Sequence, residues 1–437
     1  MGAGAFIEPL VVISLLIGGT LINRGKKREQ VLNSPIWASH KRDDSRESGP
    51  PSPSSEDELL SPRSRTSSSY LGGAGQPEEQ AGWRKRRVGL LGWQTDITSP
   101  NTAQFSDRLL SRVLRTFPFL VEVWYWALIY WVYQLGRAFT AVTLVQGTVH
   151  TARKHALQLI HLEQQLGMFW EPAIQRYFLQ YPTTMHWINR IYSFIHIPGT
   201  ILFLIWSYYL TITANKSPQR YEIERSPAGP ALYQARRRTM AMCNLIAFMV
   251  FTAWPCMPPR LLSDPEYFGG DAKEAKSYGF VDTVHGAEGE SSVWTQNRFC
   301  NQFAAMPSLH FGYSLLIGLT IASIPLASSQ EQTRSSRLWR FKAAGLSARR
   351  MLCIVLGFGY PATILLAIIA TANHFILDAV AGAMVCGIAW NAEKFLLNLL
   401  PLEDWFLWCL RMHKPEINAE VAPEWDEKAG RTNSLPR

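Results

Sequence analysis

The chain has 437 residues, of which 47% are hydrophobic and 12% aromatic, and it carries a formal net charge of +9. The apolar residues are gathered into blocks of about 17 to 25 residues, the length that crosses a bilayer, and the basic residues cluster beside these blocks. This distribution argues against a nucleic-acid partner, which needs one basic face with interleaved aromatics. The six cysteines are spread singly without a CxxC pair, which excludes the usual zinc and redox motifs.

The N-terminal third of the chain divides into an anchor and a polar linker. Residues 6–22 form an apolar run that Arg24 and further basic residues follow. A cleaved signal peptide carries its charges before the apolar core, so this order favours an uncleaved anchor over residues 1–32. Residues 33–109 are rich in Ser, Pro, Gly, Arg and Glu. Because they cannot bury enough apolar surface to offset chain entropy, they are expected to form a disordered cytosolic linker.

Residues 110–400 are predicted to form an all-α polytopic membrane domain with six core helices, so that seven spans result with the anchor. The core spans are expected at 117–145, 187–213, 240–254, 307–327, 351–372 and 374–400. Residues 151–180 place apolar side chains at helical spacing among charges, which predicts an amphipathic interfacial helix pair interrupted at Pro172. A substrate lid and a plain packing role both fit this pair. Residues 401–437 are expected to be a polar cytosolic tail.

The basic loops predict the orientation of the spans. The linker, residues 214–238 and residues 329–350 carry the Lys and Arg clusters and are therefore assigned to the cytosol, with Arg236 to Arg238 as topology signals. Residues 147–185 and 258–306 are then assigned to the outer face. Cys256 and Cys300 bracket the second of these outer loops, and either a disulfide or two unpaired thiols fits them. His196, deep in an apolar block, is a functional candidate or a satisfied core histidine, and it is not included in the predicted site.

With this topology, three separate helices deliver polar side chains to the outer face. Arg260 follows one span, Ser308 and His310 begin another, and His374 and Asp378 begin the last. His374 and Asp378 are four residues apart and share a helix face. The carboxylate can then accept a hydrogen bond from one ring nitrogen and leave the other nitrogen as a nucleophile.

The other polar residues at this face suit phosphate chemistry. Ser308 and the unpaired N–H groups at the start of its helix can bind phosphate oxygens with the help of the helix dipole. Arg260 can clamp the same phosphate. His310 can protonate the leaving oxygen as a general acid. Taken singly, each of these residues also has an ordinary structural explanation, such as a helix cap or a lipid-facing anchor.

The motif Pro307-Ser308-Leu309-His310, together with His374-x-x-x-Asp378, resembles the second and third signatures of the type-2 phosphatidic acid phosphatase superfamily. The residues from Asn301 to Met306 and the segment 254–259 are similar to the inositolphosphotransferase branch, which contains fungal inositol phosphorylceramide synthase. The resemblance covers roughly residues 110–400. It implies a six-helix core, a phosphohistidine intermediate, and no metal or other cofactor.

The resemblance also implies roles for the individual site residues. By position, His374 is the nucleophile, Asp378 its orienting partner, His310 the acid and base, and Ser308 a phosphate contact. The superfamily's Lys-x6-Arg-Pro first signature is absent from this chain, and Arg260 occupies the comparable place.

These observations lead to a lipid phosphotransferase as the main hypothesis. The expected partners are the bilayer and lipid substrates with phosphate-linked head groups, at the lumenal face of a Golgi or ER membrane. Lipid phosphatases of the superfamily usually have Gly where Leu309 stands, which favours transfer over hydrolysis. A non-enzymatic transporter or scaffold is a second class, against which the intact site argues. A metal-dependent hydrolase that adds Asp282 and His285 to the site histidines is a third, without support from a motif such as HExxH.

Overall fold

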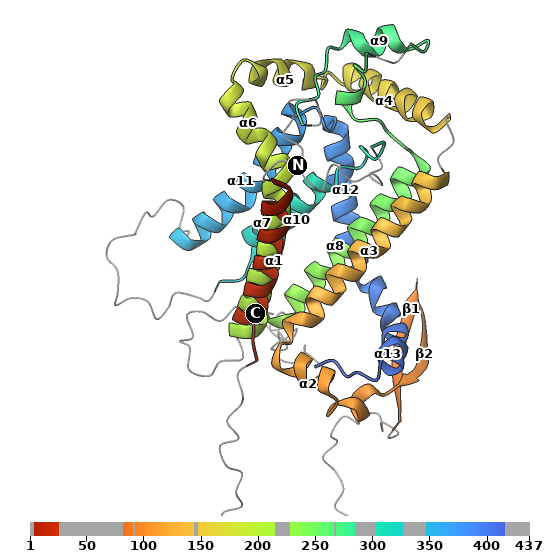
Figure 1. Ribbon diagram of the computed structural model, residues 1–437, viewed down its shortest axis with the longest axis vertical. Helices are drawn as coiled ribbons and strands as arrows, with labels where there is room; N and C mark the ends of the chain where they lie inside the picture. The colour runs from red at the N-terminus through yellow and green to blue at the C-terminus, as the bar shows by residue number, and fades with distance from the viewer. Residues whose placement is uncertain are drawn as a thin grey trace, which may run out of the picture.

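The structure, a computed structural model, describes residues 4–25, 82–90, 92–143, 147–214, 228–265, 268–284, 302–326 and 347–415. This part of the chain is mainly helical, and its helices lie in a bundle (Figure 1). Three helical segments are long and apolar enough to cross a membrane, namely Pro182–Thr213, Ala348–Ala370 and Ile376–Cys409. The predicted class of an all-α membrane protein is therefore confirmed.

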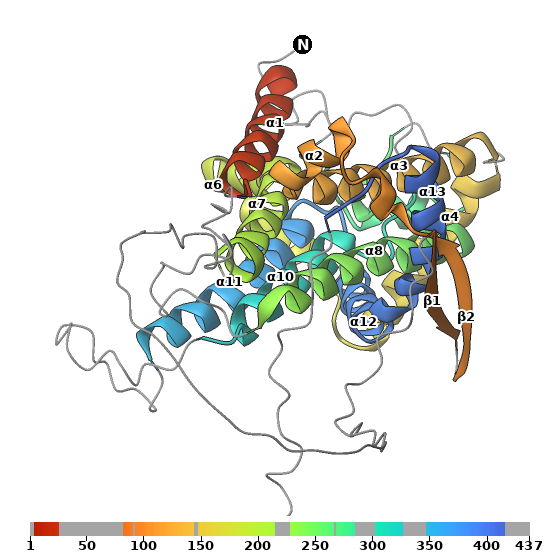
Figure 2. The same ribbon diagram turned by 90° about the horizontal axis from the view of Figure 1, so that it is seen from below.

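Each predicted span corresponds to a helix. In chain order these are α1 (Gly4–Ile22), α3 (Phe119–Thr143), α6 and α7 (Pro182–Arg190 and His196–Tyr208) joined by a π-helical turn, α8 (Gly229–Ala253), α10 (Leu309–Ser323), α11 (Ala348–Ala370) and α12 (Ile376–Ala392). Figure 2 shows α1 at one edge of the bundle, next to α7. Residues 7–22 and α10 are apolar but shorter than the membrane-length helices.

The cluster Arg236 to Arg238 lies inside α8 and not in the loop that was expected to contain it. Arg237 donates to Glu122 of α3 at 2.8 Å, and Arg238 forms an ion pair with Glu393, which follows α12. The guanidinium of Arg236 lies over the ring of Trp390, 3.2 Å from its centroid. These three side chains therefore link α8 to two neighbouring helices in addition to any effect they have on orientation.

The predicted amphipathic pair forms two short helices, α4 (Gly147–Gln165) and α5 (Glu171–Leu179). Pro172 lies in the first turn of α5, where its missing N–H leaves no hydrogen bond unmade. With α9 (Ala272–Ser277) and α6, they lie at the upper end of the bundle in Figure 1. Ala152, Ala156 and Ile160 of α4 are fully buried in one cluster with residues of the segment after α8. This burial supports the packing role for α4.

α10 lies against α11 and α12 with backbone close to backbone. A Cβ atom added to Gly318 of α10 would stand 2.1 Å from the carbonyl oxygen of Gly357 in α11. A Cβ atom on Gly382 of α12 would stand 2.3 Å from the carbonyl oxygen of Ser308. Glycine is therefore required at these crossings, because any side chain would force the helices apart.

Residues 83–100 form a β-hairpin, so the expectation of a disordered linker is wrong for this stretch. Strand β1 (Trp83–Leu90) pairs antiparallel with β2 (Trp93–Pro100), and Leu90 opposes Trp93. The turn between them contains Gly92 with φ of 91°, a conformation that glycine adopts without strain. A 3-10 turn (Thr102–Phe105) and α2 (Leu109–Thr116) then lead into α3.

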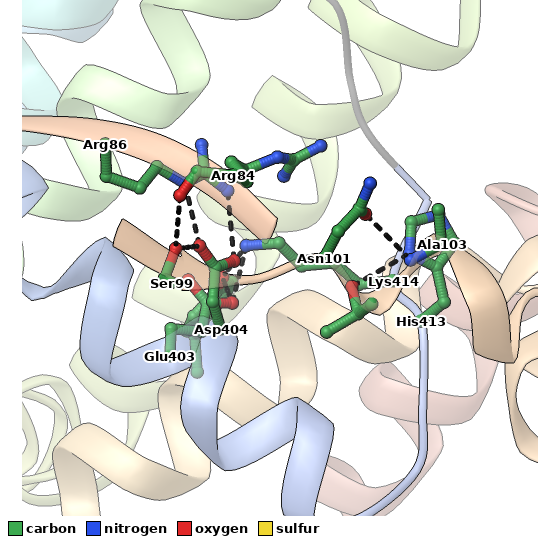
Figure 3. A network of polar contacts seen from close by, with 11 residues as sticks. Arg84, Arg86, Ser99, Asn101, Ala103, Glu403, Asp404, His413 and Lys414 are labelled. Atoms are coloured by element: carbon green, nitrogen blue, oxygen red, sulfur yellow. Dashed lines mark hydrogen bonds and ion pairs between the residues drawn. The ribbon is translucent and has the colours of Figure 1, made fainter. Parts of the chain in front are cut away.

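The hairpin is held by the C-terminal part of the chain (Figure 3). Arg86 donates to Asp404 through two nitrogens at 2.8 and 3.0 Å, and Ser99 donates to the same carboxylate at 2.7 Å. Asp404 belongs to α13 (Leu400–Cys409), which follows a 3-10 helix (Glu393–Leu399). The expectation of a polar tail from residue 401 is therefore also wrong for α13. The missing signal was long-range, since the partners of the hairpin lie 318 residues along the chain.

Candidate active site

His374 lies in the tight connection between α11 and α12. Ala372 in this connection has φ of 51°, a left-handed conformation that is uncommon outside glycine. Its carbonyl oxygen accepts the backbone N–H of Arg260 at 2.9 Å. Asn373 donates from its side chain to the hydroxyl of Thr371 at 2.9 Å. These contacts fix the connection and, with it, the direction in which His374 leaves the backbone.

The ring of His374 is oriented by a backbone carbonyl. Its Nδ1 atom lies 2.8 Å from the carbonyl oxygen of Ala305, whereas the nearest carboxylate oxygen of Asp378 lies 3.5 Å away. The expected hydrogen bond to Asp378 is thus replaced by one to Ala305. Since a carbonyl only accepts, Nδ1 must carry the proton, and the lone pair is then on Nε2. Nε2 has no hydrogen-bond partner among the described residues.

Asp378 contributes to the site through the start of α12. Its Oδ2 atom accepts the backbone N–H of Phe375 at 2.9 Å, and its backbone carbonyl accepts the N–H of Ser308 at 2.9 Å. The carboxyl group is fully buried, and its Oδ1 atom has no hydrogen-bond partner. Asp378 therefore links the start of α12 to the start of α10, which carries His310, and its carboxyl group lies beside the His374 ring.

His310 stands in the first turn of α10 and faces His374. The two ring centroids are 5.8 Å apart. On its other side the His310 ring stacks on Tyr192 at 4.7 Å and lies 5.1 Å from the ring of His196. His196 is buried, and its Nδ1 atom lies 2.8 Å from the hydroxyl of Tyr360 in α11. His196, which was left out of the predicted site, is therefore next to the predicted general acid.

Arg260 and Ser308 are placed at the same end of the bundle, but both already have partners. Arg260 donates from Nε to Asn373 at 2.9 Å and from Nη1 to Asp282 at 2.7 Å. Ser308 is fully buried, and its hydroxyl oxygen accepts the N–H of Phe311 at 3.4 Å as the N-cap of α10. The two residues therefore hold the frame of the site, and Nη2 of Arg260 makes no hydrogen bond to a described residue.

The predicted alternatives that involve metal and disulfide chemistry fall partly outside the described residues. His285 and Cys300 both lie there. Within the described ranges, no group of three His, Cys, Asp or Glu side chains is arranged to hold a metal ion. Cys256 is a free thiol and fully buried, and this burial raises its pKa well above the ordinary value. A free, buried Cys256 favours the unpaired alternative.

Two buried glutamates that sequence reasoning did not single out also reach this site. Glu163 of α4 and Glu171 of α5 are fully buried, and each accepts a backbone N–H at the start of α12. Burial raises the pKa of Glu163 to about 9 and also raises the pKa of Glu171. The available signal in the sequence was a glutamate among the apolar positions of each helix. The partners of Glu163 and Glu171 are backbone groups, which residue types do not reveal.

Comparison with known proteins identifies the family. The family model described as PAP2 superfamily matches residues 157–217, 228–328 and 338–392. These segments contain Arg260, Ser308, His310, His374 and Asp378, which the fold brings to one end of the bundle. Neither the curated proteins nor the solved structures include a match. The matched segments, the helical membrane architecture and the paired histidines agree, and the chain belongs to the PAP2 superfamily.

Proposed function

We propose that this protein is a membrane phosphotransferase that moves a phospho-head group between lipids through a phosphohistidine intermediate. Membership of the PAP2 superfamily supports an enzyme of the phosphatase or phosphotransferase kind. The observation that carries the proposal is the geometry of His374. Its Nδ1 atom is engaged by the carbonyl of Ala305 at 2.8 Å, and its Nε2 atom is left to react beside His310.

The two histidines are suited to a two-step transfer. In the first step, the lone pair on Nε2 of His374 attacks phosphorus. The bond from phosphorus to the leaving oxygen breaks, and protonated His310 gives its proton to that oxygen. In the second step, the acceptor hydroxyl gives its proton to neutral His310, and its oxygen attacks phosphorus. The phosphorus–nitrogen bond then breaks and its electron pair returns to Nε2.

The phosphoryl oxygens need positive groups while charge develops on them. Arg260 is proposed to supply this charge, because its backbone and its Nε atom are held against the connection that carries His374. Its bond to Asp282 keeps the guanidinium in place and leaves Nη2 for the ligand. Ser308 is proposed to contribute through the start of α10, where its N-cap role orients the helix.

Transfer and not hydrolysis is proposed on the motif around Leu309, and the inositolphosphotransferase branch of the superfamily is the one proposed. The site is proposed to face the lumen of a Golgi or ER membrane, which follows from the basic loops that alternate with the spans. The domain is proposed to be multi-pass, since three segments of the described chain are long and apolar enough to span.

The proposal is tested with purified protein in mixed detergent–lipid micelles. One sample receives phosphatidate, and another receives phosphatidylinositol with ceramide as acceptor. We expect head-group exchange in the second sample, and phosphate release without any exchange would refute transfer in favour of a lipid phosphate phosphatase. His374→Ala is expected to reduce turnover at least about a thousandfold, as loss of a nucleophile does elsewhere. His150→Ala, which removes an exposed histidine of α4, is the matched control.

The intermediate has its own test. A donor lipid labelled in its phosphate is expected to leave acid-labile label on the protein after rapid quenching, and the label is expected to be absent from His374→Ala. If His374→Ala keeps both turnover and label, the histidine is not the nucleophile. If neither protein shows any lipid activity and cells with His374→Ala behave as wild type, a transporter or scaffold that retains the fold is the better explanation.

A further inference from the structure

The start of α12, directly after His374, is capped by carboxyl groups from three different helices. Three consecutive backbone N–H groups each donate to a separate side chain: Phe375 to Asp378 at 2.9 Å, Ile376 to Glu171 at 2.8 Å and Leu377 to Glu163 at 2.8 Å. A helix start leaves such N–H groups without partners and favours negative charge nearby. Glu163 and Glu171 therefore fasten α4 and α5 to the base of the helix that follows His374.

The second oxygen of each glutamate is the unusual feature. Oε2 of Glu163 and Oε2 of Glu171 are both buried, and neither has a hydrogen-bond partner. The side chains of Glu163 and Glu171 interact directly with each other. Two ionised carboxylates in such a buried place would both be acceptors and would repel. One proton solves both problems, because a protonated Oε2 donates to the other carboxylate. Each orphan oxygen then has a partner, and the pair carries a single negative charge.

We propose that Glu163 and Glu171 are a carboxyl pair that shares one proton and acts as a positioning device for His374. The inference rests on the proposed function only for its effect on catalysis, since the shared proton itself is a property of the fold. The pair holds the first turn of α12 from outside, while the carbonyl of Ala305 holds the imidazole. Together they fix the backbone and the ring of the same residue.

The surroundings of the pair support a retained proton. Burial, together with the charge of Glu171, raises the pKa of Glu163 to about 9. The other titratable groups that act on the pair are Asp378 of α12 and the Cys256 thiol of the segment after α8. The charge of Asp378 contributes to the raised pKa of both glutamates, and the pair therefore stays singly protonated at neutral pH.

The pair also limits where substrate can bind. The amides of Phe375, Ile376 and Leu377 are all occupied, so these three donors are not available to a phosphate. A phosphoryl group attached to His374 therefore depends more on groups of other elements, and Arg260 and the start of α10 are neighbours of the site. This favours a phosphate on the side of His374 that faces His310, where His310 can protonate the leaving oxygen.

The decisive substitutions are Glu163→Gln and Glu163→Leu. Glutamine keeps an oxygen for the Leu377 amide and a donor for Glu171, and so it imitates the protonated acid at every pH. Leucine removes both contacts. We expect Glu163→Leu to lower kcat roughly a hundredfold with little change in KM, as a displacement of about 1 Å does, and Glu163→Gln to restore most of the rate. Gln165→Leu, at the exposed end of α4, is the control.

A second readout needs no activity. The native pKa lies above the unfolded value, so the proton stabilises the fold fully below about pH 4.5 and its contribution is lost progressively as pH rises towards 9. The thermal midpoint of the wild-type protein in detergent is therefore expected to fall over this range, and that of Glu163→Gln to fall less. Parallel curves for the two proteins, or equal loss of kcat in the Gln and Leu variants, would overturn the proposal. If wild type lacks lipid activity, the proposed function fails while the stability curves still decide the carboxyl pair.

Discussion

The contact between α10 and α12 allows a sharp test of the site's framework. Gly382 of α12 faces the backbone of Ser308, and a Cβ atom there would lie 2.3 Å from the carbonyl oxygen, whereas ordinary contact begins at 3.4 Å. Gly382→Ala must therefore separate the two helices by about 1 Å. The same helix carries a control, because Gly387 has no atom within 4 Å of an added Cβ.

The magnitude follows from two opposing effects. Overpacking costs about 1–3 kcal/mol, and replacing a helical glycine by alanine recovers about 0.5–1 kcal/mol. The atom that an added Cβ would meet belongs to the backbone and cannot rotate away. We therefore expect Gly382→Ala to lose about 2 kcal/mol of stability, in the upper part of the net range left by these two effects. Gly387→Ala is expected to gain about 0.5–1 kcal/mol.

The catalytic effect follows from the same displacement. Ser308 caps the helix on which His310 stands, so moving it by about 1 Å shifts His310 relative to His374 and is expected to reduce kcat roughly a hundredfold. Thermal unfolding in detergent and turnover on the lipid pair measure the two effects. Equal midpoints and equal rates for Gly382→Ala and Gly387→Ala would show that the helices do not meet here and would refute the arrangement of the site.

Three other predictions test separate parts of the structure. Asp378→Asn is expected to lower kcat about ten- to a hundredfold, because the carbonyl of Ala305 already sets the tautomer of His374. A loss near the roughly 10⁴-fold seen for the aspartate of a serine-protease triad would show that Asp378 sets this tautomer instead. Arg86→Ala is expected to cost about 1–3 kcal/mol, since it removes a partner of buried Asp404, and to make the hairpin sensitive to protease; an effect no larger than that of exposed Arg87→Ala would contradict this. A glycosylation acceptor inserted near Ala287 is expected to be modified in cells, and an unmodified protein would place the site on the cytosolic side.

The helices could be predicted because their information is local. Each of the seven apolar blocks became a helix, although α8 starts at Gly229 and not near residue 240. A proline marked the break between α4 and α5. The convergence of His310 and His374 was predicted from the expected topology, in which the helix ends on one side of a membrane lie at one level. The 5.8 Å between their rings required only that α10 and α12 be neighbours.

The rest of the site depends on contacts that residue types do not specify. The carbonyl of Ala305 is a backbone acceptor, and nothing in the side chain of alanine identifies it. The same holds for the amides that Glu163 and Glu171 accept. His196 gave a signal, a histidine in an apolar block, but one such residue is as often a satisfied core histidine. The sequence does not show that His196 lies beside His310, and the structure places their ring centroids 5.1 Å apart.

The contacts of Arg86 and Ser99 with Asp404, which hold the hairpin against α13, have a consequence for the order in which parts of the protein fold during synthesis. Arg86 and Asp404 are 318 residues apart. At about 5–20 residues per second, a ribosome needs roughly fifteen seconds to a minute to make the intervening chain. An isolated two-stranded hairpin is marginal in water. The contacts that hold residues 83–100 against α13 can therefore form only after nearly the whole described chain has been made.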